Sequence, residues 1–275
     1  MKKYSIALIA CFLSFGFLTA QEKEIDLFSV PLSNPNSPGK LIVNQITGSI
    51  QVEAYDGKEV IVKATVSEGH GHCDGCGDRK SESKEGMRKI STSSLNIGAE
   101  EDNNVVRIQN ELWNKKTDLY IKVPTDFSLK LKTINDGDIT VEGVNGEMEI
   151  SNINGHITLE SVSGSVLANT TNGELKVTFN SISSGKDMAF SSFNGDVEVL
   201  FPKSLKANVK AKSDMGDVYT DFDMAVSKNE PQVDKSNSSG KYRVKLEQWV
   251  KGTINGGGPE MLFKTFNGDI MIKSR

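Results

Sequence analysis

Residues 135–177 read NDGDITVEGVNGEMEISNINGHITLESVSGSVLANTTNGELKV, and this stretch decides the fold. It is an internal repeat of nine residues, marked by glycines at positions 137, 146, 155, 164 and 173. The residues two and four places after each glycine are mostly apolar, with polar residues between them. Such alternation is typical of strands with one buried and one solvated face, and it does not fit helical spacing. The apolar pairs are Ile139 and Val141, Met148 and Ile150, Ile157 and Leu159, Val166 and Ala168, and Leu175 and Val177.

The same unit recurs outside this stretch, around Gly48, Gly195, Gly216 and Gly268. Asn or Ser often precedes the glycine, which suits a bend because Asn and Gly tolerate positive φ. Intervals of 18, 22 and 21 residues between units fit two short strands plus corners. The pattern therefore predicts an all-β fold, a β-solenoid of short stacked strands with Asn-Gly turns. The alternative is an antiparallel β-meander or sandwich, because Asn-Gly between alternating segments is also a strong hairpin signal.

Domain organisation follows from where the repeat is interrupted. We expect one elongated β-repeat domain over residues 21–275, with polar insertions at about 67–104 and 223–241. Both insertions are polar and read as loops or disordered segments. Strand-like alternation resumes between Lys241 and Ile254, with Tyr242, Val244 and Leu246 as its apolar positions.

The N-terminus predicts export. Lys2 and Lys3 precede an apolar run that ends at Ala20, so residues 1–20 are predicted to be a signal peptide cleaved before Gln21. An alternative is a lipobox at 8–11, with Cys11 as the lipid anchor, but the apolar run continues beyond it. No later segment is apolar enough to span a membrane. We expect an exported protein of the periplasm, the outer surface or the surrounding medium.

The charge balance argues against nucleic acid as a partner. The formal net charge is −4, and losing Lys2 and Lys3 with the signal peptide makes it −6. Nucleic acids and anionic lipids require a basic face, which an evenly spread acidic balance does not predict.

Several stretches carry a family resemblance. They include residues 119–124 (LYIKVP), residues 129–139 (LKLKTINDGDI), the tandem Asn-Gly units, the segment 193–202 and the closing unit 265–272. On these motifs the chain resembles the bacterial putative adhesin family, a domain of unknown function built from strand repeats. The likeness covers about residue 25 to the end. It implies an exported β-solenoid-like domain and carries over no functional residues.

A compact His/Cys cluster is the strongest candidate for a metal site. His70, His72, Cys73 and Cys76 lie within seven residues. Two thiolates and two imidazoles would suit zinc or another soft metal, although structural zinc sites usually draw ligands from two separate segments. A short Cys73–Cys76 disulfide is the competing interpretation for an oxidising compartment. A redox pair would need a helix N-terminus, which the sequence does not predict here.

An acidic residue often follows the repeat glycine, and His156 occupies this slot in one unit. Rows of Asp on nonapeptide coils can bind calcium, but that motif needs a different spacing. We interpret the acids as turn-forming and solvating residues, with His156 as a spacer that relieves like-charge repulsion. The acids are Asp138, Glu147, Glu174, Asp196, Asp217 and Asp269.

Six aromatic residues could form a sugar-binding platform, but aromatics at alternating strand positions more often belong to the core or to end caps. We therefore expect a core role for Trp113, Tyr120, Phe193, Trp249, Tyr242 and Phe266.

The sequence does not predict an enzyme. It contains no G-x-S-x-G elbow, no H-E-x-x-H and no phosphate-binding loop, and its acids are dispersed. The first hypothesis is an exported non-catalytic envelope protein with an adhesin-like binding or structural role toward a glycan or protein. The alternatives are a polysaccharide-acting enzyme on a β-solenoid scaffold and a metal-binding envelope protein that uses the His/Cys cluster.

Overall fold

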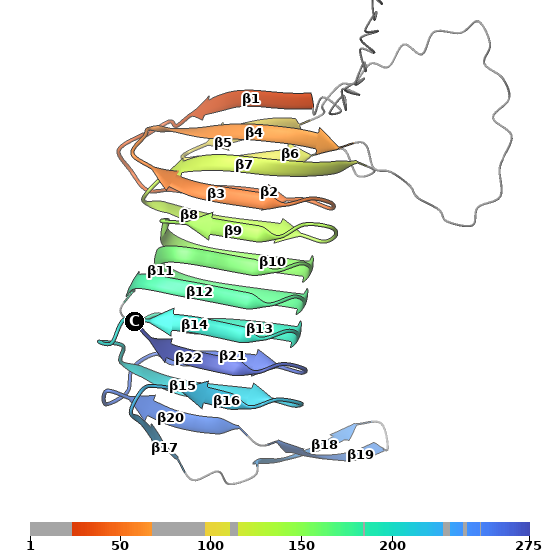
Figure 1. Cartoon of the computed structure of the whole chain (residues 1–275), viewed down its shortest axis with the longest axis vertical. Coiled ribbons are helices and arrows are strands. Elements are labelled where there is room, and N and C mark those ends of the chain that lie inside the picture. The colour runs from red at the N-terminus through yellow and green to blue at the C-terminus, as the bar shows by residue number, and fades with distance from the viewer. Residues whose placement is uncertain are drawn as a thin grey trace, which may run out of the picture.

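The chain forms a flattened β-solenoid in which two faces of stacked strands enclose one hydrophobic core (Figure 1). The computed structural model describes residues 24–67, 97–110, 115–183, 185–227, 232–238, 241–247 and 249–275. No helix long and apolar enough to cross a membrane occurs within these ranges. The β-solenoid prediction is confirmed, and antiparallel pairing within the stack is confined to its two ends.

The first face is a continuous ladder of neighbouring strands. In spatial order these are β1 (Glu24–Pro31), β4 (Glu59–Ser67), β7 (Lys116–Pro124), β3 (Ile50–Tyr55), β9 (Ile139–Glu142), the first part of β11 (Ile157–Asn172), β12 (Leu175–Ile182), β14 (Val197–Phe201), β22 (Ile270–Ser274) and β16 (Val218–Thr220).

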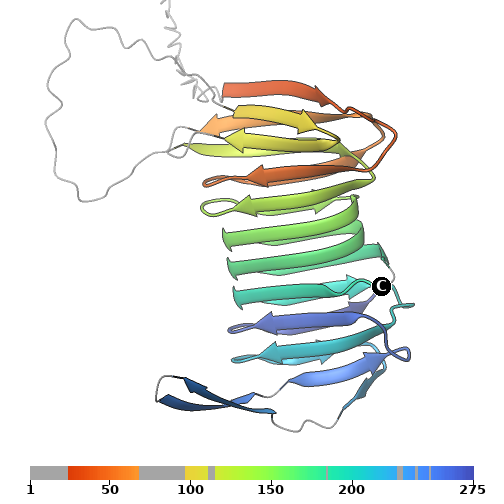
Figure 2. The same ribbon diagram turned by 180° about the vertical axis from the view of Figure 1, so that it is seen from behind.

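The second face lies opposite, as the reverse view in Figure 2 shows. In spatial order its strands are β5 (Ile97–Asp102), β6 (Val105–Asn110), β2 (Gly39–Asn44), β8 (Phe127–Thr133), β10 (Asn145–Asn154), the second part of β11, β13 (Met188–Asn194), β21 (Glu260–Thr265), β15 (Ala207–Ser213), β20 (Val250–Ile254) and β17 (Met224–Val226). A separate hairpin consists of β18 (Gln232–Ser238) and β19 (Lys241–Glu247).

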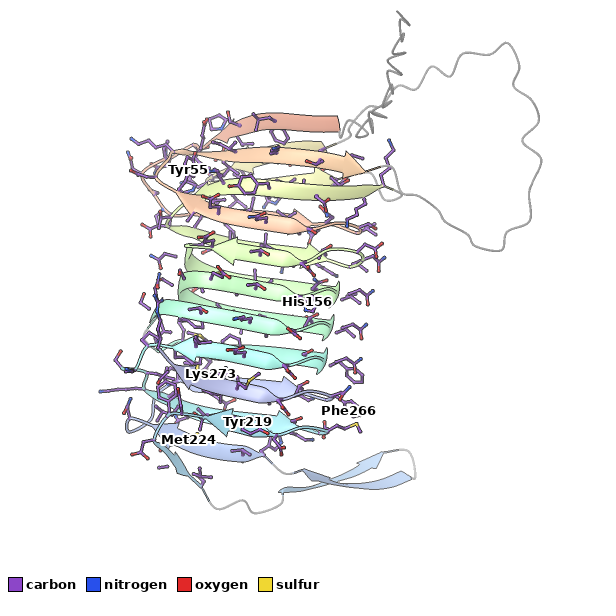
Figure 3. All side chains as sticks on the ribbon, in the orientation of Figure 1. Tyr55, His156, Tyr219, Met224, Phe266 and Lys273 are labelled. Atoms are coloured by element: carbon purple, nitrogen blue, oxygen red, sulfur yellow. The ribbon has the colours of Figure 1, made fainter. Side chains whose placement is uncertain are left out.

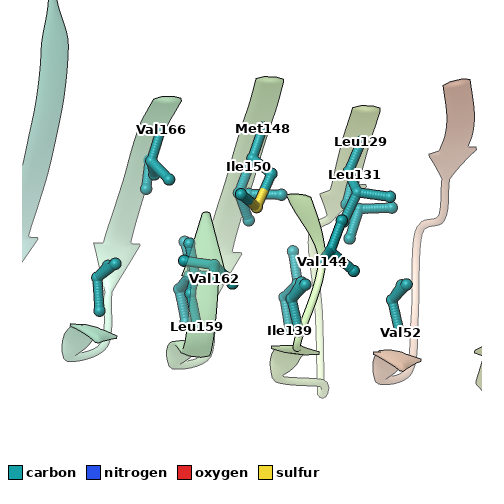
Figure 4. Close-up of a cluster of buried hydrophobic side chains, with 14 of the residues drawn as sticks. Val52, Leu129, Leu131, Ile139, Val144, Met148, Ile150, Leu159, Val162 and Val166 are labelled. Atoms are coloured by element: carbon teal, nitrogen blue, oxygen red, sulfur yellow. The ribbon is translucent and has the colours of Figure 1, made fainter. Parts of the chain in front are cut away.

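The core lies between the two faces and takes one side of every stacked strand (Figure 4). Ile139, Ile157 and Leu175 occupy equivalent positions 18 residues apart, and Val197 follows 22 residues later. These four side chains are at most 1% exposed. Burying a branched aliphatic side chain contributes about 1.5–3 kcal/mol, so the repeated apolar positions drive the coiling.

The C-terminal coil is inserted out of chain order. Strands β21 and β22 lie between the β13–β14 coil and the β15–β16 coil, and they pair in parallel with both. The last sixteen residues therefore join two parts of the solenoid that follow one another in the sequence but are not in contact as neighbouring coils.

Strands occur inside both stretches predicted to be polar insertions, so the loop expectation is wrong for those residues. β5 and most of the β5–β6 turn fall inside 67–104, and β17 and β18 fall inside 223–241. These strands lie at the ends of the solenoid or outside it. They bury less surface than a central strand, and their sequences can therefore stay polar.

A carboxylate clamp closes the N-terminal end. Glu101, on β5, accepts hydrogen bonds from the Ser33 backbone N–H at 3.0 Å, the Ser33 hydroxyl at 2.8 Å and the Asn104 backbone N–H at 2.8 Å. The Asn104 side-chain oxygen also accepts the Asn34 N–H at 2.8 Å. The two backbone donors, then the Ser33 hydroxyl, lower the pKa of Glu101 below its ordinary value of 4.5.

This clamp predicts an acid-sensitive contribution to stability. The pKa of Glu101 is lower in the folded chain than in the unfolded chain, so the contribution is present above pH 4.5 and is lost as the pH falls through the folded value. We expect Glu101→Gln to lower the urea midpoint at pH 7, and the difference from the wild type to shrink toward pH 3. A difference between the two proteins that stays constant over this range would contradict the clamp.

The glycine of the bend is needed because neighbouring coils approach closely there. Gly195 has a φ of 144°, and a Cβ at this position would lie 2.2 Å from the carbonyl oxygen of Gly173. A backbone oxygen held in a ladder of hydrogen bonds cannot move aside.

We therefore expect Gly195→Ala to reduce the free energy of unfolding by roughly 2–4 kcal/mol, measured by urea denaturation. Gly98→Ala is the matched control, because a Cβ at Gly98 meets nothing within 4 Å. The control should leave the stability unchanged or raise it slightly. Equal effects of the two substitutions would contradict the close-approach argument.

Candidate binding edge at the Asn-Gly bends

The bends that lead from the second face to the first face form one long edge of the solenoid, on the right in Figure 1. Each coil contributes the same short motif to this edge: a hydroxyl or amide residue, an exposed residue, usually Asn, then Gly and a polar residue. Because coils stack in register, each motif position forms a row along the edge. We call this surface the bend edge.

The innermost row satisfies the carbonyl groups of the bends. The side chain three residues before each glycine is buried and donates to the glycine carbonyl of the neighbouring coil. Thr170 reaches Gly155 at 3.0 Å, and Ser192 reaches Gly173 at 2.9 Å. Buried backbone groups must be paired, so these hydroxyls allow the bends to pack without water between them. The sequence analysis did not single out this row, although its regular offset from glycine was visible.

The asparagines form a second row of mutual hydrogen bonds. The amide of Asn154 donates to Asn135 at 3.0 Å, that of Asn172 to Asn154 at 2.8 Å, and that of Asn194 to Asn172 at 2.9 Å. Each such amide therefore bridges neighbouring coils at the surface. The row adds a regular polar ladder beside the exposed residues.

The residues after the glycines bind the backbone of the neighbouring coil. Asp196 accepts the N–H of Asp269 at 2.8 Å, and Asp269 accepts the N–H of Asp217 at 2.9 Å. His156 takes the same role, since its Nδ1 accepts the N–H of Glu174 at 3.0 Å. A nitrogen that accepts carries no proton, so His156 acts as a neutral acceptor in this bond rather than as a cationic spacer.

The exposed row carries the unexpected feature of the edge. It contains Ile46, Ile153, Phe193 and Phe266, and Met215 lies beside it. Phe193 is 51% exposed, Phe266 is 40% exposed and Met215 is 68% exposed. Figure 3 shows Phe266 at the edge, pointing away from the body of the solenoid. We call these five residues the apolar stripe.

The core role expected for Phe193 and Phe266 is therefore wrong. Phe190 and Ser192 point inward on β13, so Phe193 has the opposite parity and faces outward. The rings of Phe193 and Phe266 stack with centroids 4.9 Å apart and an interplanar angle of 4°. Counting parity from the buried Phe190 would have revealed this exposure from the sequence.

The remaining aromatic residues lie elsewhere. Tyr120 is half-buried and bonds to Glu53 on the first face. Trp249 is half-buried near the C-terminal end, with the Lys210 ammonium 4.5 Å from its ring centroid. Trp113 and the side chain of Tyr242 lie outside the described residues.

The field along the stripe is negative. Asp196, Asp217 and Asp269 have no Lys or Arg within ion-pair distance in the part of the chain that the structure describes. The charges of Asp217 and then Asp269 raise the pKa of the nearby Tyr219 hydroxyl above its ordinary value. The bend edge thus combines exposed apolar groups with unpaired carboxylates.

The predicted metal ligands cannot be placed. His70, His72, Cys73 and Cys76 lie outside the described residues, and so does Cys11. The zinc and disulfide hypotheses therefore stay predictions. Across the described ranges, no group of three or more His, Cys, Asp or Glu residues is arranged to hold a metal ion.

Comparison with known proteins places the chain in a fold family. Residues 89–255 match the family described as Toastrack DUF4097. No curated protein sequence matches the chain.

Three solved structures are similar to it. A putative cell adhesion protein from Clostridium sporogenes shares 14% identity with a TM-score of 0.44, over 92% of this chain and 100% of that one. A putative adhesin from Bacteroides fragilis shares 14% identity with a TM-score of 0.42, over 92% and 98%. A putative lipid binding protein from Parabacteroides distasonis shares 10% identity with a TM-score of 0.26, over 91% and 96%.

The stacked rings should contribute little to folding. Both are partly solvated, so we expect Phe193→Ala and Phe266→Ala each to cost less than about 1.5 kcal/mol of stability. A double-mutant cycle should give a coupling of about 0.5–1 kcal/mol, measured by urea denaturation. Zero coupling would show that the rings do not stack in solution.

Proposed function

The chain belongs to the Toastrack DUF4097 family, and from this premise we propose that it is an exported, non-catalytic envelope protein that binds another protein through its bend edge. The observation that carries the proposal is the exposed Phe193–Phe266 stack.

Exposure of this stripe contrasts with the packing of the rest of the solenoid. The inward apolar positions of the stacked strands are buried, whereas the stripe leaves two phenyl rings, two isoleucines and a methionine in contact with solvent. Contiguous apolar surface on a soluble protein usually marks an interaction site. A fold that places one side chain per coil at this edge could hold polar residues there at no cost to its core.

The ring geometry favours a protein over a glycan. Sugars bind aromatic residues by packing their C–H groups on free ring faces. Here the two rings cover each other's facing sides and present mainly their edges to solvent. Rings in this arrangement suit the side chains of a protein partner, and aromatic residues are enriched among the residues that dominate binding energy at protein interfaces.

The carboxylates of the edge support a non-catalytic role. Asp138, Asp196 and Asp269 each already accept a backbone N–H of the neighbouring coil. They occur at one per coil, as components of the stack. Export is supported by residues 1–20, with their basic start, apolar run and final Ala20.

The experiment compares two surface variants in binding to envelope material. Purified protein is immobilised and exposed to envelope fractions that have been treated with a protease, with glycan-degrading enzymes, or with neither. We expect protease treatment to abolish binding and glycan removal to leave it unchanged. Phe193→Ser combined with Phe266→Ser should weaken binding at least about tenfold, because hot-spot rings contribute 2 kcal/mol or more.

Leu167→Ser is the matched control. Leu167 is an apolar side chain on the second face, 50% exposed and outside the stripe. It should bind like the wild type. Binding that survives the double Phe substitution, or that is lost on glycan removal alone, would overturn the proposal.

A further inference from the structure

The β18–β19 hairpin is the one part of the described chain that forms a sheet of its own. Its strands pair only with each other, from Gln232 opposite Glu247 to Ser238 opposite Lys241. Figures 1 and 2 show it projecting from the C-terminal end of the solenoid, beyond the bend edge. An isolated two-stranded hairpin is only marginally stable in water and gains stability by packing against another surface.

The sequence of this hairpin is amphipathic and basic. Along β19, the basic residues Lys241, Arg243 and Lys245 alternate with the apolar residues Tyr242, Val244 and Leu246. The segment 232–247 contains four basic and two acidic residues. In a chain of net negative charge, it is a local concentration of positive charge.

The bend edge offers the complementary chemistry. Its apolar stripe runs beside a row of carboxylates that includes Glu174, Asp196 and Asp269, and no printed ion pair in the described chain uses any of the three. A partner for this surface needs apolar side chains together with Lys or Arg.

The two surfaces also match in length. A strand of seven residues spans about 23 Å at 3.3 Å per residue. Five successive coils carry Ile153, Thr171, Phe193, Phe266 and Asp214, and at about 4.8 Å between strands they span about 19 Å. The hairpin can therefore cover the C-terminal half of the edge, where the two rings lie.

We propose that the partner of the bend edge is a second copy of this chain, which docks its β18–β19 hairpin on the apolar stripe. This inference rests on the proposed function and names the protein that the edge binds. The contact joins two different surfaces, so each molecule keeps one free hairpin and one free edge unless the assembly closes on itself. Self-association would then link exported molecules to one another, as a homotypic adhesin requires.

The test is the self-association of the purified protein, followed by sedimentation velocity from about 1 to 100 μM. We expect concentration-dependent association that weakens at least tenfold between 50 and 500 mM salt, because the contact pairs opposite charges. The triple variant Lys241→Glu, Arg243→Glu and Lys245→Glu should weaken it at least tenfold, and so should Phe193→Ser combined with Phe266→Ser. Leu167→Ser should associate like the wild type.

A mixing experiment tests the pairing of the two surfaces directly. The triple hairpin variant keeps an intact edge, and the double Phe variant keeps an intact hairpin. Mixed together, they should form a one-to-one complex that neither forms alone. Circular dichroism of each variant checks that the solenoid is folded.

The outcomes separate this inference from the proposed function. A wild-type protein that stays monomeric to 100 μM, or a hairpin variant that associates like the wild type, overturns the inference. If the double Phe variant still loses envelope binding in that case, the proposed function stands with another protein as partner. If neither association nor envelope binding depends on the rings, both proposals fail.

Discussion

Close stacking of the bends is the constraint on which the structure depends. Neighbouring coils approach until a glycine Cβ would collide with a backbone oxygen, as at Gly195 against the carbonyl of Gly173. At that distance no water can enter, so the bend carbonyls need donors from the protein itself. Thr170 and Ser192 supply them from inside the coil, and the residues after the glycines bind the N–H groups from outside. The apolar core can form a continuous column because its polar boundary is satisfied in this way.

The same constraint determines the character of the bend edge. Stacking in register gives every coil one outward side chain at the same position, so the surface is written one residue at a time. The Asn row uses this regularity to form a ladder of amide hydrogen bonds. Phe193 and Phe266 use it to stack their rings. A rigid, periodic scaffold presents these groups in a fixed arrangement, which lowers the entropic cost of binding a partner.

The architecture could be predicted because period-two alternation and the nine-residue glycine spacing act locally. Ile139, Ile157 and Val197 are buried as that pattern requires. The exposure of Phe193 was missed because aromatic residues in strands usually belong to the core, and its parity relative to Phe190 was not counted. The strands within residues 97–102 and 232–238 were missed because edge and peripheral strands bury too little surface to need an apolar sequence. The hydroxyl row was overlooked because Thr and Ser at strand ends are common without any such role.

The order of the coils lies beyond any local pattern, and it bears directly on function. The unit at Gly216 follows the unit at Gly195 in the sequence, yet the coil with Gly268 lies between them. Phe266 and Asp269 therefore reach Phe193 and Asp196 only when the C-terminal strands β21 and β22 have entered the stack. Contacts between residues 73 positions apart form late, because the entropy of closing so long a loop must first be overcome. The apolar and acidic half of the bend edge is consequently assembled by the last coil, so a chain that has not finished folding does not present it.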